Sequence, residues 1–320
     1  MVTEAPPPGQ RAPLESGCAA VTASRPQTAV AFIVRDKFAW ALASLRRLYA
    51  LAGEPFTLYF VDGVYPRETR AGLERFLADK PNVVWIQAHR FLYSNEALNL
   101  VAGRIAEPYL FLLQNDVLIG RDALKRLLES ARLLGADLVA PVILDTDSGV
   151  PAIHRDTAEP VMIVQEGERV FVARGAPAEW RDGRQRVYHF ETHSLLITSE
   201  ALRSVCPLPP ISVHEHIDMA VALWRQGRSM HRDPRVRVLF MDAPPLALRD
   251  YECPFFRFRW DAARAKQSDD YVRSRWRLAD LFDVMPFIGR QQLALRPEAV
   301  LTRYDSVFEP DLWPEEIAAA

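Results

Sequence analysis

Residues 109–116 read YLFLLQND, an apolar run of five residues followed by three polar ones. A short, nearly continuous apolar run predicts a strand that is buried on both faces, as the strands of parallel sheets are. Ligands of an open parallel sheet bind outside the carboxyl ends of its strands, where Gln114, Asn115 and Asp116 would lie. The stretch therefore predicts an α/β fold and places a candidate site at the end of this strand.

The same pattern repeats on both sides of this stretch. Residues 28–34 (TAVAFIV) form another buried run, and runs at 57–61, 83–86 and 137–143 predict further strands. Apolar residues at helical spacing lie between these runs. Residues 161–173 differ, because two apolar segments flank Glu-Gly-Glu as in an antiparallel hairpin. We expect a Rossmann-like, mainly parallel sheet flanked by helices, with a small antiparallel addition and a C-terminal helical tail.

The chain has enough apolar material for one large domain. It is 49% hydrophobic and 25% charged, and no linker rich in Gly, Ser or charge divides its middle. Residues 1–27 are rich in Pro and Ala and lack the apolar core of a secretory signal, so we expect them to be disordered. We expect a catalytic domain over 28–250, with halves 28–145 and 146–250, and a helical tail over 251–320.

Composition also limits the partners and the compartment. A net charge of −2 gives no support to a nucleic-acid-binding protein. Three dispersed cysteines favour free thiols in a reducing, cytoplasmic compartment. No run approaches the roughly 20 apolar residues that span a bilayer. Basic and aromatic residues interleave over 255–277, which suits either peripheral contact with the inner membrane surface or, as we prefer, packing of a terminal helix on the sheet.

Several motifs occur in an order that is typical of one enzyme family. Asp62 closes the second strand, and Asn95 and Asn99 are spaced along a polar helix that leads into YLFLLQNDV. Further on, ETHSLLITSEAL precedes HEHIDMAVALWRQG, which places Glu215 and Asp218 at the start of a helix. From about residue 28 to residue 278, this order resembles the family 2 glycosyltransferases, which have the nucleotide-sugar-binding fold known as GT-A.

The resemblance implies a donor site and a metal. The residues that would bind the nucleotide-sugar donor are Val34, Asp62, Asn95, Asn99, Gln114, Asn115 and Asp116. A divalent ion, Mn²⁺ or Mg²⁺, would be held at Asp116, with Asp242 as a second ligand, and would share the donor diphosphate. The implied reaction is an inverting transfer of the sugar to a hydroxyl group of a glycan, a lipid-linked glycan or a small molecule.

The start of the helix at Glu215 contains the candidates for the catalytic base. Glu215, His216 and Asp218 lie within one turn, and we expect a carboxylate to be the base, with His216 as its rival. Acidic residues also favour a helix start through the macrodipole alone. On the acceptor side, Trp180 could stack on a sugar ring and His193 could line the site. We expect His189 and His193, four residues apart, to lie on the acceptor side or the surface rather than to bind a metal.

Three departures from the family pattern keep other functions open. Gln114 replaces the first Asp of the usual metal motif, His216 stands at the presumed base position, and Phe240 stands where a late His is expected. These residues would fit a non-catalytic protein that binds nucleotide sugars. A sugar nucleotidyltransferase is a weaker alternative, because its first strand is normally followed by a Gly-rich loop and VRDKFAW has no Gly.

Overall fold

Residues 109–114, the apolar run and the Gln that follows it, form β4, near the middle of a large mixed sheet. The computed structural model describes residues 26–145, 152–154, 161–167, 169–174, 179–241, 248–278, 281–293 and 295. In this part of the chain the strand order is β10-β11-β13-β6-β12-β4-β1-β2-β3, with β5 and β7 paired to β13 and β6. The strands are β1 (Thr28–Ile33), β2 (Phe56–Asp62), β3 (Val83–Gln87), β4 (Tyr109–Gln114), β5 (Val117–Ile119), β6 (Leu138–Asp145), β7 (Ala152–Ile153), β10 (Glu179–Arg181), β11 (Arg184–Arg186), β12 (Ser194–Thr198) and β13 (Met230–Phe240).

The centre of the sheet is parallel, as the apolar runs predict. β1 pairs in parallel with β2 on one side and with β4 on the other, and β2 pairs in parallel with β3. β12 is antiparallel and lies between β4 and β6. All six residues of β1 are buried, because each face of the strand meets a separate apolar layer.

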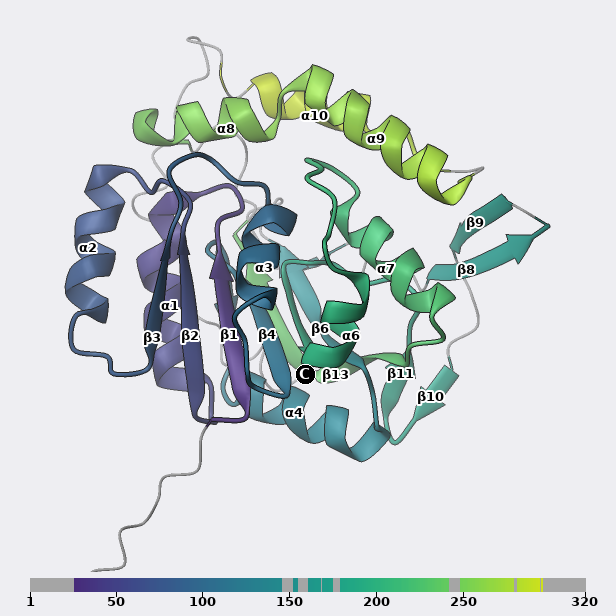
Figure 1. The fold of residues 1–320 in the computed structure, drawn as a ribbon, viewed down its shortest axis with the longest axis horizontal. Helices are drawn as coiled ribbons and strands as arrows, with labels where there is room; N and C mark the ends of the chain where they lie inside the picture. Colours follow the sequence, from purple (N-terminus) through teal and green to yellow (C-terminus); the bar gives the residue numbers. More distant parts are fainter. Residues whose placement is uncertain are drawn as a thin grey trace, which may run out of the picture.

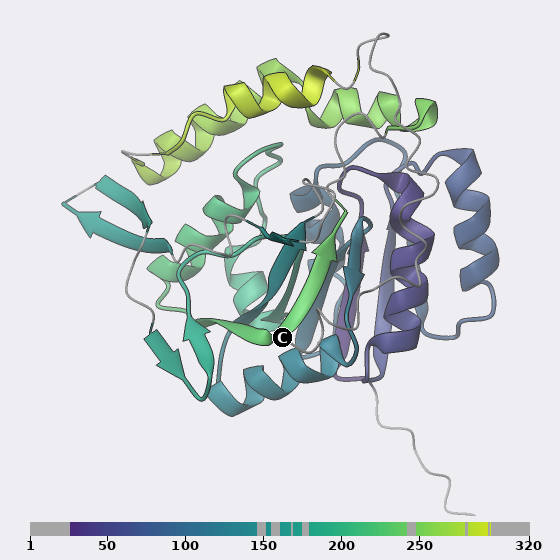
Figure 2. The same ribbon diagram turned by 180° about the vertical axis from the view of Figure 1, so that it is seen from behind.

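Helices cover both faces of the sheet. One layer contains α3 (Ser94–Ala102), α6 (Ser199–Val205) and α7 (Glu215–Arg225), and it packs on Ala29, Ala31 and the other side chains of that face. The opposite layer contains α1 (Ala41–Leu51), α2 (Arg67–Leu77) and α4 (Ala123–Leu134), and it packs on Val30 and Phe32. Figures 1 and 2 show the two layers from opposite sides. The expected mainly parallel α/β sheet with flanking helices is confirmed.

The last helices lie across one edge of the sheet. Two short 3-10 turns, η1 (Phe38–Trp40) and η3 (Asp250–Glu252), precede α1 and α8 (Cys253–Arg259), and α9 (Ala262–Trp276) and α10 (Met285–Leu293) follow. In Figure 1 these yellow-green helices lie above the edge toward which the arrows of β1, β2 and β3 point. The helical tail therefore covers the carboxyl ends of the parallel strands, where a ligand site is expected.

Two further elements test the expectations. β8 (Val161–Glu166) and β9 (Arg169–Arg174) pair as an antiparallel hairpin, which confirms the small antiparallel addition. No described helix is long and apolar enough to cross a membrane. The cytoplasmic location, the peripheral membrane contact and the domain boundaries stay predictions, and residues 1–25 lie outside the described part of the chain.

Candidate functional site

A cavity of about 640 Å³ lies where the strand ends meet the C-terminal helices. Arg35 and Asp36, which follow β1 directly, form part of its wall. The first turn of α7 contributes Glu215 and His216, and the end of α8 contributes Arg259. The cavity is within the 300–1,000 Å³ range of small-molecule sites, and its wall combines charged and aromatic side chains.

Four of these side chains form a buried charge network. The Arg35 guanidinium contacts the Glu215 carboxylate and lies 3.6 Å from Asp36. Arg259 donates a hydrogen bond of 3.1 Å to the same Glu215 oxygen, and its Nε lies 3.9 Å from Asp36. Burial alone would raise the pKa of Glu215, but the charges of Arg259 and Arg35 lower it to about 2. Glu215 is therefore an ionised partner of two arginines.

Asp116 is a buried carboxylate that, unlike Glu215, is not hydrogen-bonded to an arginine of the described chain. It follows β4, it is fully buried, and neither of its oxygens has a hydrogen-bond partner among the described residues. Burial raises the pKa of Asp116 to about 7, and the neighbouring Asp36 carboxylate adds to this shift. Oδ1 of Asp36 likewise has no hydrogen-bond partner among the described residues, although Nε of Arg259 lies 3.9 Å from it. Two carboxylates with unused oxygens, at the ends of the adjacent strands β1 and β4, fit a hard divalent cation.

Gln114 and Asn115 position other groups of the site. Asn115 accepts a hydrogen bond from the Arg35 backbone N–H at 2.7 Å and donates one of 2.9 Å to the Lys37 carbonyl. Gln114 Oε1 lies 2.8 Å from Nδ1 of His193, which lines the cavity. Both amides lie outside the cavity wall, and they fix the segment after β1 and the ring of His193.

Asp116 and the remaining predicted donor residues also lie outside the cavity wall. Asp62 accepts bonds from the Tyr65 N–H in its own strand-end turn and from the Gln87 amide at the end of the neighbouring strand β3. Asn99 makes two bonds of 2.8 Å with the backbone of Leu208, and Asn95 donates one to Pro209. Val34 is buried in the apolar layer of α1. The structure thus brings Asp116 close to Asp36 and engages Asp62, Asn95 and Asn99 with neighbouring backbone and side chains.

Asp218 faces the C-terminal helix. It accepts hydrogen bonds from Arg275 at 3.1 Å and from the Trp276 indole at 2.7 Å. Burial raises the pKa of Asp218 in spite of these partners. Asp218 is not part of the cavity wall and joins α7 to α9, so of the three predicted base candidates only Glu215 and His216 line the cavity.

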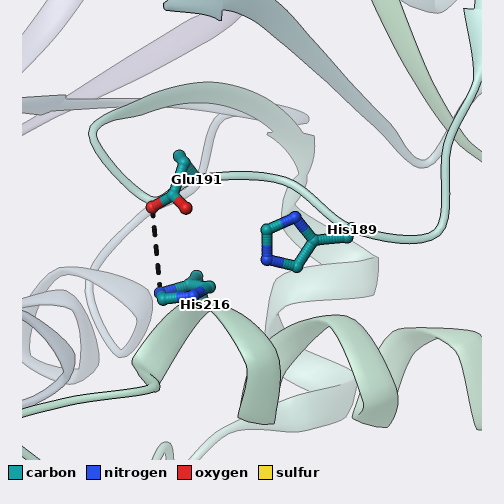
Figure 3. Close-up of side chains that lie close together, drawn as sticks. All are labelled: His189, Glu191 and His216. Atoms are coloured by element: carbon teal, nitrogen blue, oxygen red, sulfur yellow. Dashed lines mark ion pairs between the residues drawn. The ribbon is translucent and has the colours of Figure 1, made fainter. Parts of the chain in front are cut away.

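Three side chains gather beside the first turn of α7. His189 and Glu191 come from the loop before β12, His216 comes from α7, and their ligand atoms lie within 4.8 Å of one another. Figure 3 shows the three side chains turned toward a common space. His216 Nδ1 and His193 Nε2 each lie 3.8 Å from Oε2 of Glu191. Burial and the charge of Arg35 lower the pKa of His193 well below its ordinary value.

Comparison with known proteins identifies the fold. No protein-family model matches the sequence, and no curated protein matches it. Among solved structures, the chain is similar to GalNAc-T7 with UDP, GalNAc and Mn²⁺, at 12% identity and a TM-score of 0.53 over 84% of this chain and 54% of that one. It is also similar to the mannosyltransferase PcManGT from Pyrobaculum calidifontis in complex with GDP-Man and Mn²⁺, at 12% identity and a TM-score of 0.52 over 85% and 70% of the two chains. The fold is the GT-A fold of glycosyltransferases. The chain spans about half the length of GalNAc-T7.

Within this GT-A fold, several cavity residues were not predicted from the sequence. Arg35 and Asp36 follow a buried strand, so the rule that selected Asp116 could have found them. Arg259 and Glu191 lie in segments without a periodic pattern, and only the tertiary fold brings them to the site. Asp242 and the side chain of Trp180 lie outside the described part of the structure, so the metal role of Asp242 and the acceptor role of Trp180 stay predictions.

Proposed function

We propose that this protein transfers a sugar from a nucleoside-diphosphate donor to an acceptor hydroxyl. The observation that carries the proposal is the charged cavity at the carboxyl edge of a GT-A sheet. The neighbouring structures contain UDP or GDP-Man together with Mn²⁺, which supports a nucleotide-sugar donor here. Nη1 of Arg259 and the indole N–H of Trp260 are buried at the cavity and have no hydrogen-bond partner among the described residues, so both can donate to phosphate oxygens.

Asp36 and Asp116 are the residues that would hold a divalent metal. Their unused carboxylate oxygens fit the oxygen preference of Mn²⁺ and Mg²⁺, and donor phosphates and waters would complete the coordination. Such an ion supplies positive charge for the departing nucleoside diphosphate. Arg35 and Arg259 add two guanidinium groups at the same cavity, although each is already paired with Glu215.

We assign the base to His216. Glu215, the carboxylate favoured by the sequence, is bound by two arginines, and a pKa of about 2 makes it a poor proton acceptor near neutral pH. His216 lines the cavity, and its Nδ1 faces the Glu191 carboxylate at 3.8 Å. In the proposed step the acceptor oxygen attacks the anomeric carbon, the bond to the diphosphate breaks, and the hydroxyl proton passes to His216. Glu191 would stabilise the resulting imidazolium.

Release of nucleoside diphosphate tests the function. We expect UDP or GDP release from a matching sugar donor with Mn²⁺, slowly to water and faster with an acceptor. Binding of nucleoside diphosphate without release from any donor, over a panel of UDP-, GDP- and dTDP-sugars, would instead support the non-catalytic binding protein.

A further inference from the structure

We propose that His189, Glu191 and His216 form a second metal site, selective for Zn²⁺ or a similar transition metal and separate from the Asp36–Asp116 pair. The three ligand atoms lie within 4.8 Å of one another, and two of the residues are buried. Burying the His189 imidazole and the Glu191 carboxylate beside the half-buried His216 is costly unless polar or charged partners satisfy them. A metal ion bound by all three would satisfy them at once.

The donor set decides which metal fits. Two imidazole nitrogens and one carboxylate oxygen form a ligand set that binds Zn²⁺ in enzymes and leaves a fourth position open. Mg²⁺ and Mn²⁺ prefer oxygen ligands, which the Asp36–Asp116 pair offers. The two sites therefore differ in metal preference.

The surroundings also set the strength of binding. Burial lowers the pKa of Arg232 to about 10, and the charge of Glu191 opposes this fall. Glu191 also contributes to the raised pKa of Arg35, after the larger contributions of Glu215, Asp36 and Asp116. Both arginines are therefore close enough to Glu191 to compete with a dication for its charge. Their competition weakens zinc binding relative to a site without cations.

The site has a consequence for the reaction, which rests on the proposed function. A metal ion bound to His216 uses the one nitrogen lone pair of the neutral ring, and the other nitrogen already carries a hydrogen. The ring therefore cannot accept the proton of the acceptor hydroxyl. Zn²⁺ is therefore expected to inhibit transfer that Mn²⁺ supports. His189 is required for zinc but has no part in the proton transfer.

Zinc titration of the full chain tests the site. Calorimetry after treatment with a chelator should find one equivalent of Zn²⁺ on the wild type. His189→Ala should weaken binding by more than the roughly 10- to 100-fold that loss of an outer-shell partner costs. His89→Ala, which changes an exposed histidine elsewhere, and Asp116→Ala should bind zinc as the wild type does. Equal affinity of His189→Ala and the wild type overturns the site.

A spectroscopic measurement and an activity assay complete the test. X-ray absorption of the zinc-loaded wild type should show two imidazole nitrogens at about 2.0–2.1 Å, and a shell of oxygens alone overturns the site whether or not the variant folds. Zinc should inhibit donor turnover by the wild type and spare His189→Ala; equal inhibition of both overturns the link to His216. If zinc binds but no donor turns over, the proposed function fails and the metal site stands.

Discussion

Asp116 and Glu215 are two buried carboxylates near the same cavity, and only Glu215 lines it. Both are fully surrounded by protein, and burial raises the pKa of each. Glu215 contacts two arginines, which lower its pKa to about 2, whereas Asp116 lies near the Asp36 carboxylate and has a pKa of about 7. Glu215 is thus neutralised by two arginines in contact with it, whereas the charges of Arg35 and Lys37 only partly offset the burial of Asp116, whose oxygens have no hydrogen-bond partner among the described residues. We therefore assign a structural role to Glu215 and a cation-binding role to Asp116.

Replacing His216 should have the largest effect. If Glu215 is only an ion-pair partner, His216→Ala removes the base and lowers kcat by roughly 10²–10⁴-fold, the usual contribution of a general base. The Kd for the nucleoside diphosphate should not change, because His216 is assigned to the acceptor side. Steady-state kinetics with calorimetry would check both. Activity within tenfold of the wild type would return the base to a carboxylate.

Glu215→Gln should mainly reduce stability. The substitution removes the anion that contacts Arg35 and Arg259 and leaves them only the longer contacts of 3.6 and 3.9 Å with Asp36, which costs up to roughly 3–5 kcal/mol of unfolding free energy. Urea denaturation at pH 7 measures this cost. Glu74→Gln is the matched control, because Glu74 pairs with Arg70 at the surface and its loss should cost less than about 1 kcal/mol.

The stability lost in Glu215→Gln should depend on pH, because the pKa of Glu215 is lowered in the folded protein. The folded protein keeps Glu215 ionised below the pH at which the unfolded chain takes up a proton. Its stabilisation is therefore complete above about pH 5 and is lost as the pH falls toward 2. The difference between the wild type and Glu215→Gln should shrink over this range. A difference that does not vary with pH would contradict the role of the two arginines.

Asp116→Asn should increase stability in the absence of metal, whereas Glu215→Gln reduces it. With its pKa raised to about 7, folded Asp116 retains a proton that the unfolded chain releases from about pH 4 upward. The wild type therefore loses stability as the pH rises from about 4 to 7, by up to about 4 kcal/mol. In a chelator, Asp116→Asn should melt at a higher temperature than the wild type at pH 8, with a smaller gain at pH 5. The exposed control Asp270→Asn should show no such trend.

Asn99→Ala should have the smallest effect. Its amide makes two hydrogen bonds to Leu208, so its loss should cost about 1–3 kcal/mol of stability. Donor binding should stay unchanged, unlike the loss expected when Asp116 is replaced. Weaker nucleotide binding by Asn99→Ala at a temperature where the protein is folded would restore Asn99 to the donor site.

The centre of the sheet could be predicted because burial on both faces leaves an uninterrupted apolar run. β1 and β4 have this property, and their ends pointed to Asp116. β13 could not be predicted in the same way, because its sequence MHRDPRVRVLF contains charges and a proline. Asp233 in this strand is buried and is bound by Ser130 and Arg235, and Pro234 lies where the register shifts against β6. Some of the residues that stabilise these polar side chains within the sheet, such as Ser130, are distant in sequence.

The predicted helix start supplies Glu215 and His216 to the cavity wall, whereas the predicted strand end supplies none of its three polar residues. Gln114, Asn115 and Asp116 lie at the expected edge, but their individual roles depend on tertiary neighbours such as Asp36 and His193. Similarly, nothing in the local sequence indicates that Arg259 reaches Glu215 from 44 residues away. A sequence pattern locates a carboxylate, and the fold determines its charge partner.

The most direct test of the account is a thermal-shift measurement with nucleoside diphosphates. Wild type and Asp116→Asn would be compared with UDP, GDP and dTDP, each with and without Mn²⁺, because a ligand that binds only the folded state raises Tm. The account predicts that one of the diphosphates raises the Tm of the wild type more strongly with Mn²⁺ and that Asp116→Asn loses this metal-dependent gain. An equal gain in both proteins, or no gain with any diphosphate, would contradict it.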